Sequence, residues 1–275
     1  MSKPAAARPA VAPVPVLLRE DREGIAMLTL NRPAARNALS EAMLDALCAG
    51  LKAIGGDKSV RAVVLAANGP VFSAGHDLKE LTAHRNDPDR GRAYFEQIFR
   101  QSADVMQAIV ALPQPVIAAV QGLATAAGCQ LAASCDLVVA AENAKFSLPG
   151  VDIGLFCSSP VVPVVRKIAP GHALELLFTG EPISAARARE IGLVNRIALT
   201  GKERDEALAL ARTVASKSAY VQHIGKAAFY RQLDMNLADA YRHMTDVMAE
   251  NMLAYDAEEG IDAFLSKRAP KWEDR

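Results

Sequence analysis

The sequence predicts an α/β fold followed by a helical C-terminal appendage, and three observations support this class. Short apolar runs alternate with helical stripes from about residue 16 to residue 198, and beyond Ile197 the strand pattern fades into helical patterns. The chain has 275 residues, about half of them apolar, which suits one large domain with an appendage. The expected parts are a flexible tail at 1–15, an α/β core at 16–200 and a helical C-terminal region at 201–275.

The first elements follow from local patterns. Residues 16–18 and 25–30 form apolar runs that predict two strands joined by the polar turn 21–24. Ser40 is typical of a helix N-cap, and the apolar stripe after it predicts a helix that closes at Gly55-Gly56.

The next elements continue the alternation. Residues 60–66 are mostly apolar, which is typical of a strand buried on both faces. The remaining expected elements, in chain order, are a helix from Phe95 to Val110, a strand at 116–120, a small-residue helix at 126–133, a strand at 136–141 and a helix at 203–216.

Composition narrows the class of function. Acidic and basic residues balance at 31 each, so no global field favours nucleic acid or an anionic membrane. No apolar run reaches the roughly 18 residues that a membrane span needs. The five histidines are scattered and the four cysteines form no CxxC pair, so we expect reduced thiols and no metal site. The sequence contains no strand–GxGxxG–helix unit, so we do not expect it to bind a nicotinamide cofactor.

Two segments carry a resemblance to a known family. They are Val71-Phe72-Ser73-Ala74-Gly75-His76-Asp77-Leu78 and Val120-Gln121-Gly122 through Gly128-Cys129-Gln130-Leu131, with Asn37-Ala38-Leu39 upstream and Phe264-Leu265-Ser266-Lys267-Arg268 near the end. In this order they resemble the enoyl-CoA hydratase/isomerase (crotonase) family. The resemblance implies a ClpP-like spiral of repeated ββα units, with the helical region 201–275 forming a homotrimer or a hexamer of two trimers.

The same segments suit enolate chemistry on an acyl-CoA thioester. Negative charge develops on the thioester oxygen, and two backbone N–H groups, one of them beside a helix N-terminus, stabilise it without side-chain reorganisation. Small residues let the ligand approach such donors closely. The resemblance places the two donors of this oxyanion hole at Ala74 and Ala127. The alternative is that these Ala/Gly runs merely let a helix pack closely on the sheet.

The resemblance also suggests where coenzyme A binds, as part of the substrate and without a separate cofactor. Arg36 suits phosphate recognition because a guanidinium donates forked hydrogen bonds, although an exposed loop arginine is an equal alternative. His76 is a candidate for proton transfer, and Asp77 is more typical of a cap on the next turn. The expected coenzyme A contacts are Arg36, Ala38, Ala74, His76, Asp77, Leu78, Phe264 and Lys267.

Proton transfer is the weak point of the resemblance. Typical hydratases of the family use two glutamates, and the corresponding positions here are Gln130 and Gly150. Glutamine cannot exchange a proton near pH 7, although it can hold a water molecule. Asp152 is a candidate substitute, because an extended segment would place it on the same side as Gly150. Cys157 is more typical of a small apolar filler than of a nucleophile, and Ser158 has no evident base beside it.

These residues leave several functions open. The leading expectation is an enoyl-CoA hydratase-like lyase of fatty acid metabolism, acting through Gln130-bound water or Asp152. The alternatives are a non-catalytic or regulatory acyl-CoA-binding protein, and an isomerase or thioester hydrolase with a nonstandard base. We expect a cytoplasmic location, or a mitochondrial one if the Ala/Pro-rich N-terminus is a transit peptide. We expect neither nucleic acid nor membrane as a partner.

Overall fold

A six-stranded sheet forms the centre of the protein, in the order β1-β2-β3-β4-β6-β9. The computed structural model describes residues 14–275, so the predicted tail lies outside the described residues except for Val14 and Pro15. The β1–β2 pair is antiparallel and every other pair in this sheet is parallel. Its strands are β1 (Leu17–Arg22), β2 (Ile25–Leu30), β3 (Ala62–Ala67), β4 (Val116–Val120), β6 (Leu137–Ala141) and β9 (Arg196–Ala198).

Both faces of this sheet are covered, which explains its continuous apolar strands. Alternate residues of β3 point to opposite faces, and all six are buried. Val63 and Leu65 belong to the larger core cluster, whereas Ala62, Val64 and Ala66 pack with residues of α8 (Glu203–Ala215) on the other face. The predicted two-sided burial of this strand is confirmed.

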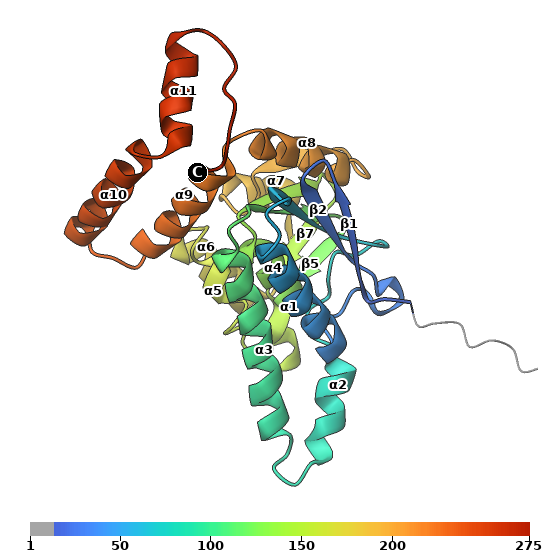
Figure 1. Ribbon diagram of the computed structural model, residues 1–275. Coiled ribbons are helices and arrows are strands. Elements are labelled where there is room, and N and C mark those ends of the chain that lie inside the picture. Colours follow the sequence, from blue (N-terminus) through green and yellow to red (C-terminus); the bar gives the residue numbers. More distant parts are fainter. Residues whose placement is uncertain (1–13) are drawn as a thin grey trace, which may run out of the picture.

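Helices on the larger core face shape the neighbourhood of the site. Helix α1 (Glu41–Gly55) begins as predicted, because the Ser40 side chain accepts a hydrogen bond from the Met43 N–H at 3.3 Å. In Figure 1, α3 lies beside α1 at the front of the sheet and extends away from the body together with α2. The other helices here are α2 (Leu78–Ala83), α3 (Arg92–Ala111), α4 (Ala127–Ser134), α5 (Val161–Val164), α6 (Pro170–Thr179) and α7 (Ala185–Glu190).

A second, three-stranded sheet lies at the carboxyl end of the central strands. Strand β5 (Leu123–Thr125) pairs in parallel with β7 (Lys145–Ser147), which pairs antiparallel with β8 (Ile183–Ser184). Because β5 ends immediately before α4, this small sheet fixes the start of that helix. The paired small sheet was not among the sequence expectations, since its strands have only two or three residues.

The last three helices project from the body (Figure 1). They are α9 (Ala219–Gln232), α10 (Leu237–Met252) and α11 (Tyr255–Leu265), whereas α8, although it also follows residue 200, packs on the sheet. Lys226 of α9 donates to Asp136 at 2.7 Å and Tyr230 donates to the same carboxylate at 2.9 Å. These contacts anchor the projecting helices to the strand that follows α4. Within the described residues, no helix is long and apolar enough to span a membrane.

Candidate functional site

Three chain segments meet at the carboxyl ends of β3 and β4. An isolated parallel bridge joins Leu39 to His76, and another joins Ser73 to Ala124. The segment 71–77 therefore lies between the turn before α1 and strand β5. Loops after parallel strands gather at one edge of the sheet, and this edge is the usual place for a ligand site.

The start of α4 is held in an unusual backbone conformation. Ala126 has φ 50° and ψ −122°, and its N–H donates to the Ser147 carbonyl at 3.0 Å. A non-glycine residue at positive φ persists only where its surroundings impose it. This turn leaves Ala127 as the first residue of α4, with an N–H that has no acceptor among the described residues.

Gly128 allows α4 to approach the neighbouring segment. A Cβ atom added there would lie 2.2 Å from the Ser73 carbonyl oxygen. Only glycine permits this backbone-to-backbone contact. The close packing considered for the Ala/Gly run is therefore present at this turn, which also leaves the Ala127 N–H without an acceptor in the described chain.

The structure does not leave the N–H of the predicted donor Ala74 free. Its N–H donates to the Arg36 carbonyl at 3.0 Å, so it is not free for a ligand. At the next residue, the Gly75 carbonyl accepts from the Leu39 N–H at 2.8 Å. In a planar trans peptide the next N–H points the opposite way. The His76 N–H therefore points away from Leu39, and it has no acceptor within residues 14–275.

The free N–H groups of His76 and Ala127, which we call the amide pair, come from adjacent backbone. A Cβ atom added at Gly75 would lie 3.1 Å from the Ala127 nitrogen and 3.0 Å from the Ala126 Cβ. Gly75 also has φ 86°, which glycine adopts without strain. The expectation that the Ala74 N–H is free is wrong, because that group is bonded to the Arg36 carbonyl, a long-range contact that the sequence alone does not show.

The His76 side chain is largely buried against α3. Its ring meets the Phe99 ring edge-on, with centroids 5.2 Å apart. Burial lowers the pKa of His76 to about 4, and the nearby Leu39 backbone opposes this shift slightly. Nδ1 has no hydrogen-bond partner in the described chain. The ring is therefore neutral near pH 7 and a weak base, which disfavours the proton-transfer role considered for it.

Asp77 acts as the cap that its position predicts. Its carboxylate accepts from the Lys79 N–H at 3.2 Å at the start of α2. It also pairs with the Arg32 guanidinium at 3.2 Å, and Arg32 donates to the Ala38 carbonyl at 3.1 Å. Asp77 thus ties the loop before α1 to the segment 71–77.

Gln130 lies one helical turn after Ala127 and is only 3% exposed. Its side-chain Oε1 has no hydrogen-bond partner within the described residues. A buried amide oxygen without a partner is costly, so this atom indicates a site for a water molecule or a ligand group. The side chain itself supplies no exchangeable proton.

At the position of the second glutamate, Gly150 has no side chain, and neighbouring atoms occupy the space that a side chain would need. A Cβ atom at Gly150 would lie 2.9 Å from the Leu155 carbonyl oxygen and 3.0 Å from the Cys157 Sγ. Cys157 is buried, and burial raises the pKa of its thiol. The thiol and the backbone around it occupy the space that a side chain at 150 would need. Cys157 was expected as a small apolar filler, and it has this packing here.

Asp152 does not lie where the sequence reasoning put it. Residues Pro149–Ile153 form a 3₁₀ helix rather than an extended segment. With three residues per turn, positions 150 and 152 do not share a side. The Asp152 side chain is exposed and faces Gly180, whose added Cβ would lie 3.1 Å from a carboxylate oxygen. The premise for Asp152 as the substitute base is therefore wrong.

The expected coenzyme A contacts fall into two groups. Arg36 and Leu78 are exposed beside the segment 71–77, and Ala38 is buried there. Phe264, 82% exposed, and Lys267 lie at the end of α11, which Figure 1 places on the far side of α9 and α10 from α4. Within a single chain these two residues are therefore remote from the amide pair.

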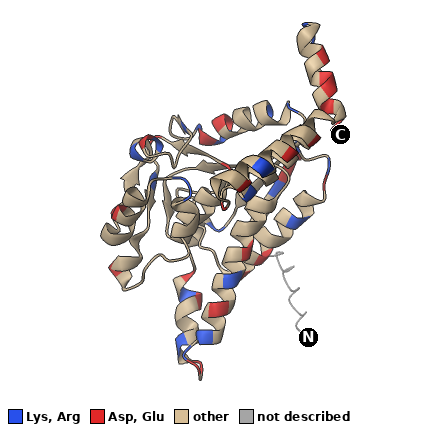
Figure 2. Cartoon of the chain, turned by 90° about the vertical axis from the view of Figure 1, so that its left-hand side faces the viewer, with Lys and Arg blue, Asp and Glu red and all other residues tan. Residues whose placement is uncertain are grey.

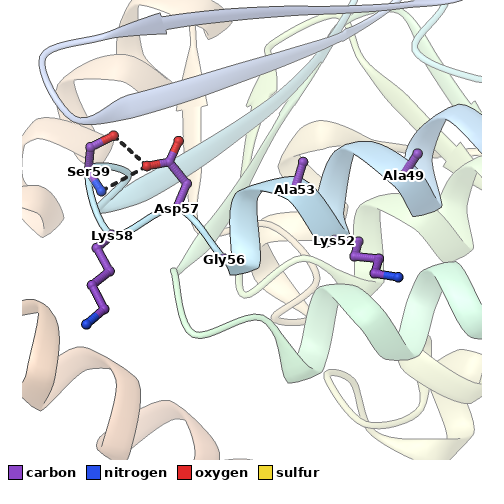
Figure 3. A pocket seen from close by; sticks show the side chains of 7 residues that line it. All are labelled: Ala49, Lys52, Ala53, Gly56, Asp57, Lys58 and Ser59. Atoms are coloured by element: carbon purple, nitrogen blue, oxygen red, sulfur yellow. Dashed lines mark hydrogen bonds between the residues drawn. The ribbon is translucent and has the colours of Figure 1, made fainter.

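Other features of the described residues do not form a competing site. No cluster of three or more His, Cys, Asp or Glu side chains in residues 14–275 has the arrangement of a metal site. A shallow hollow at the end of α1, shown in Figure 3, is lined by Lys52 and Lys58 among others, and its Asp57 is bonded to Ser59. It lies at the amino end of β3, opposite the amide pair. Positive and negative side chains are interspersed along the helices (Figure 2).

Comparison with known proteins places these features in a family. The model of the family described as enoyl-CoA hydratase/isomerase matches residues 20–275. Human enoyl-CoA hydratase domain-containing protein 3, mitochondrial, is 45% identical over 250 residues, covering 91% of this chain and 81% of that protein. The runs 122–131 and 150–158 resemble the same branch of the family, so the local motifs and the whole-chain comparison agree.

Solved structures agree with the sequence matches. An enoyl-CoA hydratase from Mycobacterium smegmatis has a TM-score of 0.89 at 48% identity, covering 94% of this chain and 99% of that one. An enoyl-CoA hydratase from Bacillus anthracis has a TM-score of 0.88 at 28% identity, with coverage of 94% and 100%. The predicted crotonase fold is confirmed.

Proposed function

The chain belongs to the enoyl-CoA hydratase/isomerase family, and from this premise we propose that it binds an acyl-CoA thioester with the carbonyl oxygen between the N–H groups of His76 and Ala127. The observation that carries this proposal is the amide pair itself: two free backbone donors on adjacent segments, one at the start of α4. Such donors favour a carbonyl oxygen that gains negative charge. The helix dipole adds to this attraction.

The described side chains around the amide pair lack the acid–base groups that hydration of an enoyl-CoA needs. Standard hydration needs two carboxylates, and the corresponding positions hold Gln130 and Gly150. The neutral His76 ring and the Cys157 thiol, whose pKa is raised, are poor proton-transfer groups near pH 7. We propose that binding and polarising the thioester is the principal property of this site. Rapid hydration is not expected.

Slow hydration is the second candidate function, and the unpartnered Oε1 of Gln130 favours it. A water molecule held there would lie one helical turn from the Ala127 donor. No carboxylate is present at these positions to accept a proton from that water molecule. Each missing acid–base group lowers the rate by about 10²–10⁴-fold. We therefore propose a hydratase-like lyase activity in fatty acid metabolism only at a low rate.

Two measurements test the proposed function. Titration calorimetry compares butyryl-CoA, which has no double bond to hydrate, with free coenzyme A. The amide pair predicts about tenfold tighter binding of the thioester, from two added hydrogen bonds. Crotonyl-CoA turnover should stay at or below roughly 10⁻³ s⁻¹. Equal affinity for both ligands would refute the proposal, and turnover near 10 s⁻¹ (about the median for enzymes) would refute its limit on chemistry.

We also propose that the chain forms a homotrimer, or a hexamer of two trimers. Helix α10 has no buried residue, and its exposed apolar residues recur every three or four positions, which places them on one face. A second copy covering this face would also bring α11, with Phe264 and Lys267, towards a neighbouring site. The residues of this stripe are Leu237, Tyr241, Met244, Met248 and Met252.

Light scattering after gel filtration tests this assembly. Met248→Asp should shift the protein towards smaller species because it places a charge in the apolar stripe. Glu250→Ala, two residues on and so on another side of α10, should not. A wild-type protein that is monomeric at all concentrations would contradict the proposed trimer.

The location of the protein stays a prediction. The human relative carries the word mitochondrial in its name. A cytoplasmic location is expected here, and a mitochondrial one if residues 1–15 act as a transit peptide. Fractionation of the source cells distinguishes the two.

A further inference from the structure

Asn37 connects the turn before α1 to the segment that carries the His76 N–H. It is fully buried and has φ 50°, a conformation that asparagine tolerates better than most residues. Its side-chain Nδ2 donates to the Val71 carbonyl at 2.8 Å and to the Asn68 carbonyl at 2.9 Å. Its Oδ1 accepts from the Arg32 N–H at 2.8 Å. Its Nδ2 therefore joins this turn to residues 68–71, while its Oδ1 braces the turn itself.

The backbone around Asn37 continues these contacts up to the amide pair. The Asn37 carbonyl accepts from the Ser73 Oγ at 2.9 Å, and the adjacent Arg36 carbonyl accepts from the Ala74 N–H. The Leu39 N–H then holds the Gly75 carbonyl. Because a peptide is planar, fixing the Gly75 carbonyl also fixes the direction of the His76 N–H.

We propose that Asn37 is the positioning residue of the amide pair. It touches no ligand, but it holds the segment 71–75 so that the His76 N–H stays aimed at the point shared with the Ala127 N–H. This inference rests on the proposed function, since it assumes that the amide pair binds the thioester oxygen. Hydrogen-bond strength falls steeply with angle, so a small rotation of the segment would cost the site its polarising effect.

Replacement of Asn37 has a specific consequence. Asn37→Ala leaves the carbonyls of Asn68 and Val71 without their donor and places alanine at a positive φ. The turn would then relax, and the segment 71–75 with it. Asn31→Ala is the matched control, because the Asn31 side chain is hydrogen-bonded to Asn68 and Pro15 nearby but makes no hydrogen bond to residues 71–77.

The test compares butyryl-CoA with free coenzyme A for each full-length variant, with [1-¹³C]butyryl-CoA to report the carbonyl resonance when bound. Asn37→Ala should lose the about tenfold preference for the thioester and the downfield carbonyl shift. Its affinity for free coenzyme A should change by less than about threefold. Asn31→Ala should keep both properties. A purely structural role would weaken both ligands alike and leave their ratio unchanged.

A folded Asn37→Ala that retains the preference and the carbonyl shift overturns the inference. If that variant does not fold, Ser73→Ala decides, because it removes only the bond from Ser73 to the Asn37 carbonyl and a long contact with the Gly75 N–H. It should reduce the preference about threefold, and an unchanged preference overturns the inference. A wild-type protein without any preference for the thioester refutes the proposed function instead.

Discussion

The amide pair and the two proton-transfer positions, Gln130 and Gly150, lie on neighbouring elements but are built in opposite ways. The amide pair is backbone, held by contacts between chain segments such as the bond from Ala74 to Arg36. The proton-transfer positions depend on side chains, and theirs are an unpartnered amide and a glycine packed against Cys157. The fold therefore preserves charge stabilisation independently of side-chain identity. Proton transfer has no such protection, because one substitution removes it.

The largest expected effect breaks the amide pair through the backbone. Gly128→Val should destabilise the protein by about 4 kcal/mol, because its Cβ would overlap the Ser73 carbonyl oxygen. Urea unfolding monitored by circular dichroism measures this. Gly171→Ala in α6, where an added Cβ meets nothing within 4 Å, should instead stabilise slightly, by about 0.5 kcal/mol. Equal effects from the two variants would contradict the close contact.

A smaller effect reports on the buried ring beside the amide pair. The pKa of His76 is about 4 in the folded state, below its ordinary 6.5, so the unfolded chain binds a proton first as pH falls. His76 should therefore contribute full stability above pH 6.5, and lose about 3 kcal/mol of it between pH 6.5 and pH 4. Unfolding free energies at pH 7 and pH 5 measure the loss. His76→Phe should show a shallower pH dependence, and an unchanged profile would contradict the burial of a neutral ring.

Restoring one carboxylate, at position 130, tests the proton-transfer half of the comparison. Gln130→Glu places a base one turn after Ala127, and should raise deuterium exchange at Cα of butyryl-CoA about 100-fold. Mass spectrometry in D₂O follows the exchange, with Gln130→Ala as the control that adds no base. Exchange that does not exceed this control would place position 130 away from the substrate's Cα.

Position 150 should not respond in the same way. Adding Gly150→Glu to Gln130→Glu should yield less than about tenfold further activity, because Leu155 and Cys157 fill the space for the new side chain. Crotonyl-CoA hydration measures the difference. A gain of several hundredfold would show that this packing yields easily.

The smallest effect concerns the methyl group of Ala127. Ala127→Gly keeps the N–H, so the affinity for butyryl-CoA should change by less than about threefold, at a cost of about 1 kcal/mol or less in helix stability. Calorimetry and thermal unfolding give the two values. A tenfold loss of affinity would show that the methyl group, and not only the N–H, contacts the ligand.

Patterns of burial and capping could be predicted from the sequence, whereas contacts between distant segments could not. The apolar run of β3 and the caps at Ser40 and Asp77 depend on nearby residues, and the structure has them as expected. The predicted helix at 126–133 also matches α4 to within one residue at each end, because the pattern that indicates it is local.

The two errors have different origins, one in a contact between distant segments and one in a misjudged local conformation. Ala74 was preferred over His76 because the bond from Ala74 to Arg36 joins residues 38 positions apart, and no local signal indicates it. Asp152 was misplaced because an extended segment was assumed where the chain forms a 3₁₀ helix. Gly154, which ends that helix at positive φ, is a residue type that the sequence offers as a signal for a turn there.

One carbon-13 spectrum of wild-type protein with [1-¹³C]crotonyl-CoA tests the central claim most directly, because it reports polarisation and reaction in one sample. The amide pair without carboxylates predicts a bound carbonyl resonance shifted downfield, with formation of the 3-hydroxy product no faster than roughly 10⁻³ s⁻¹. An unshifted carbonyl resonance, or complete conversion to the hydrated product within seconds, would contradict it.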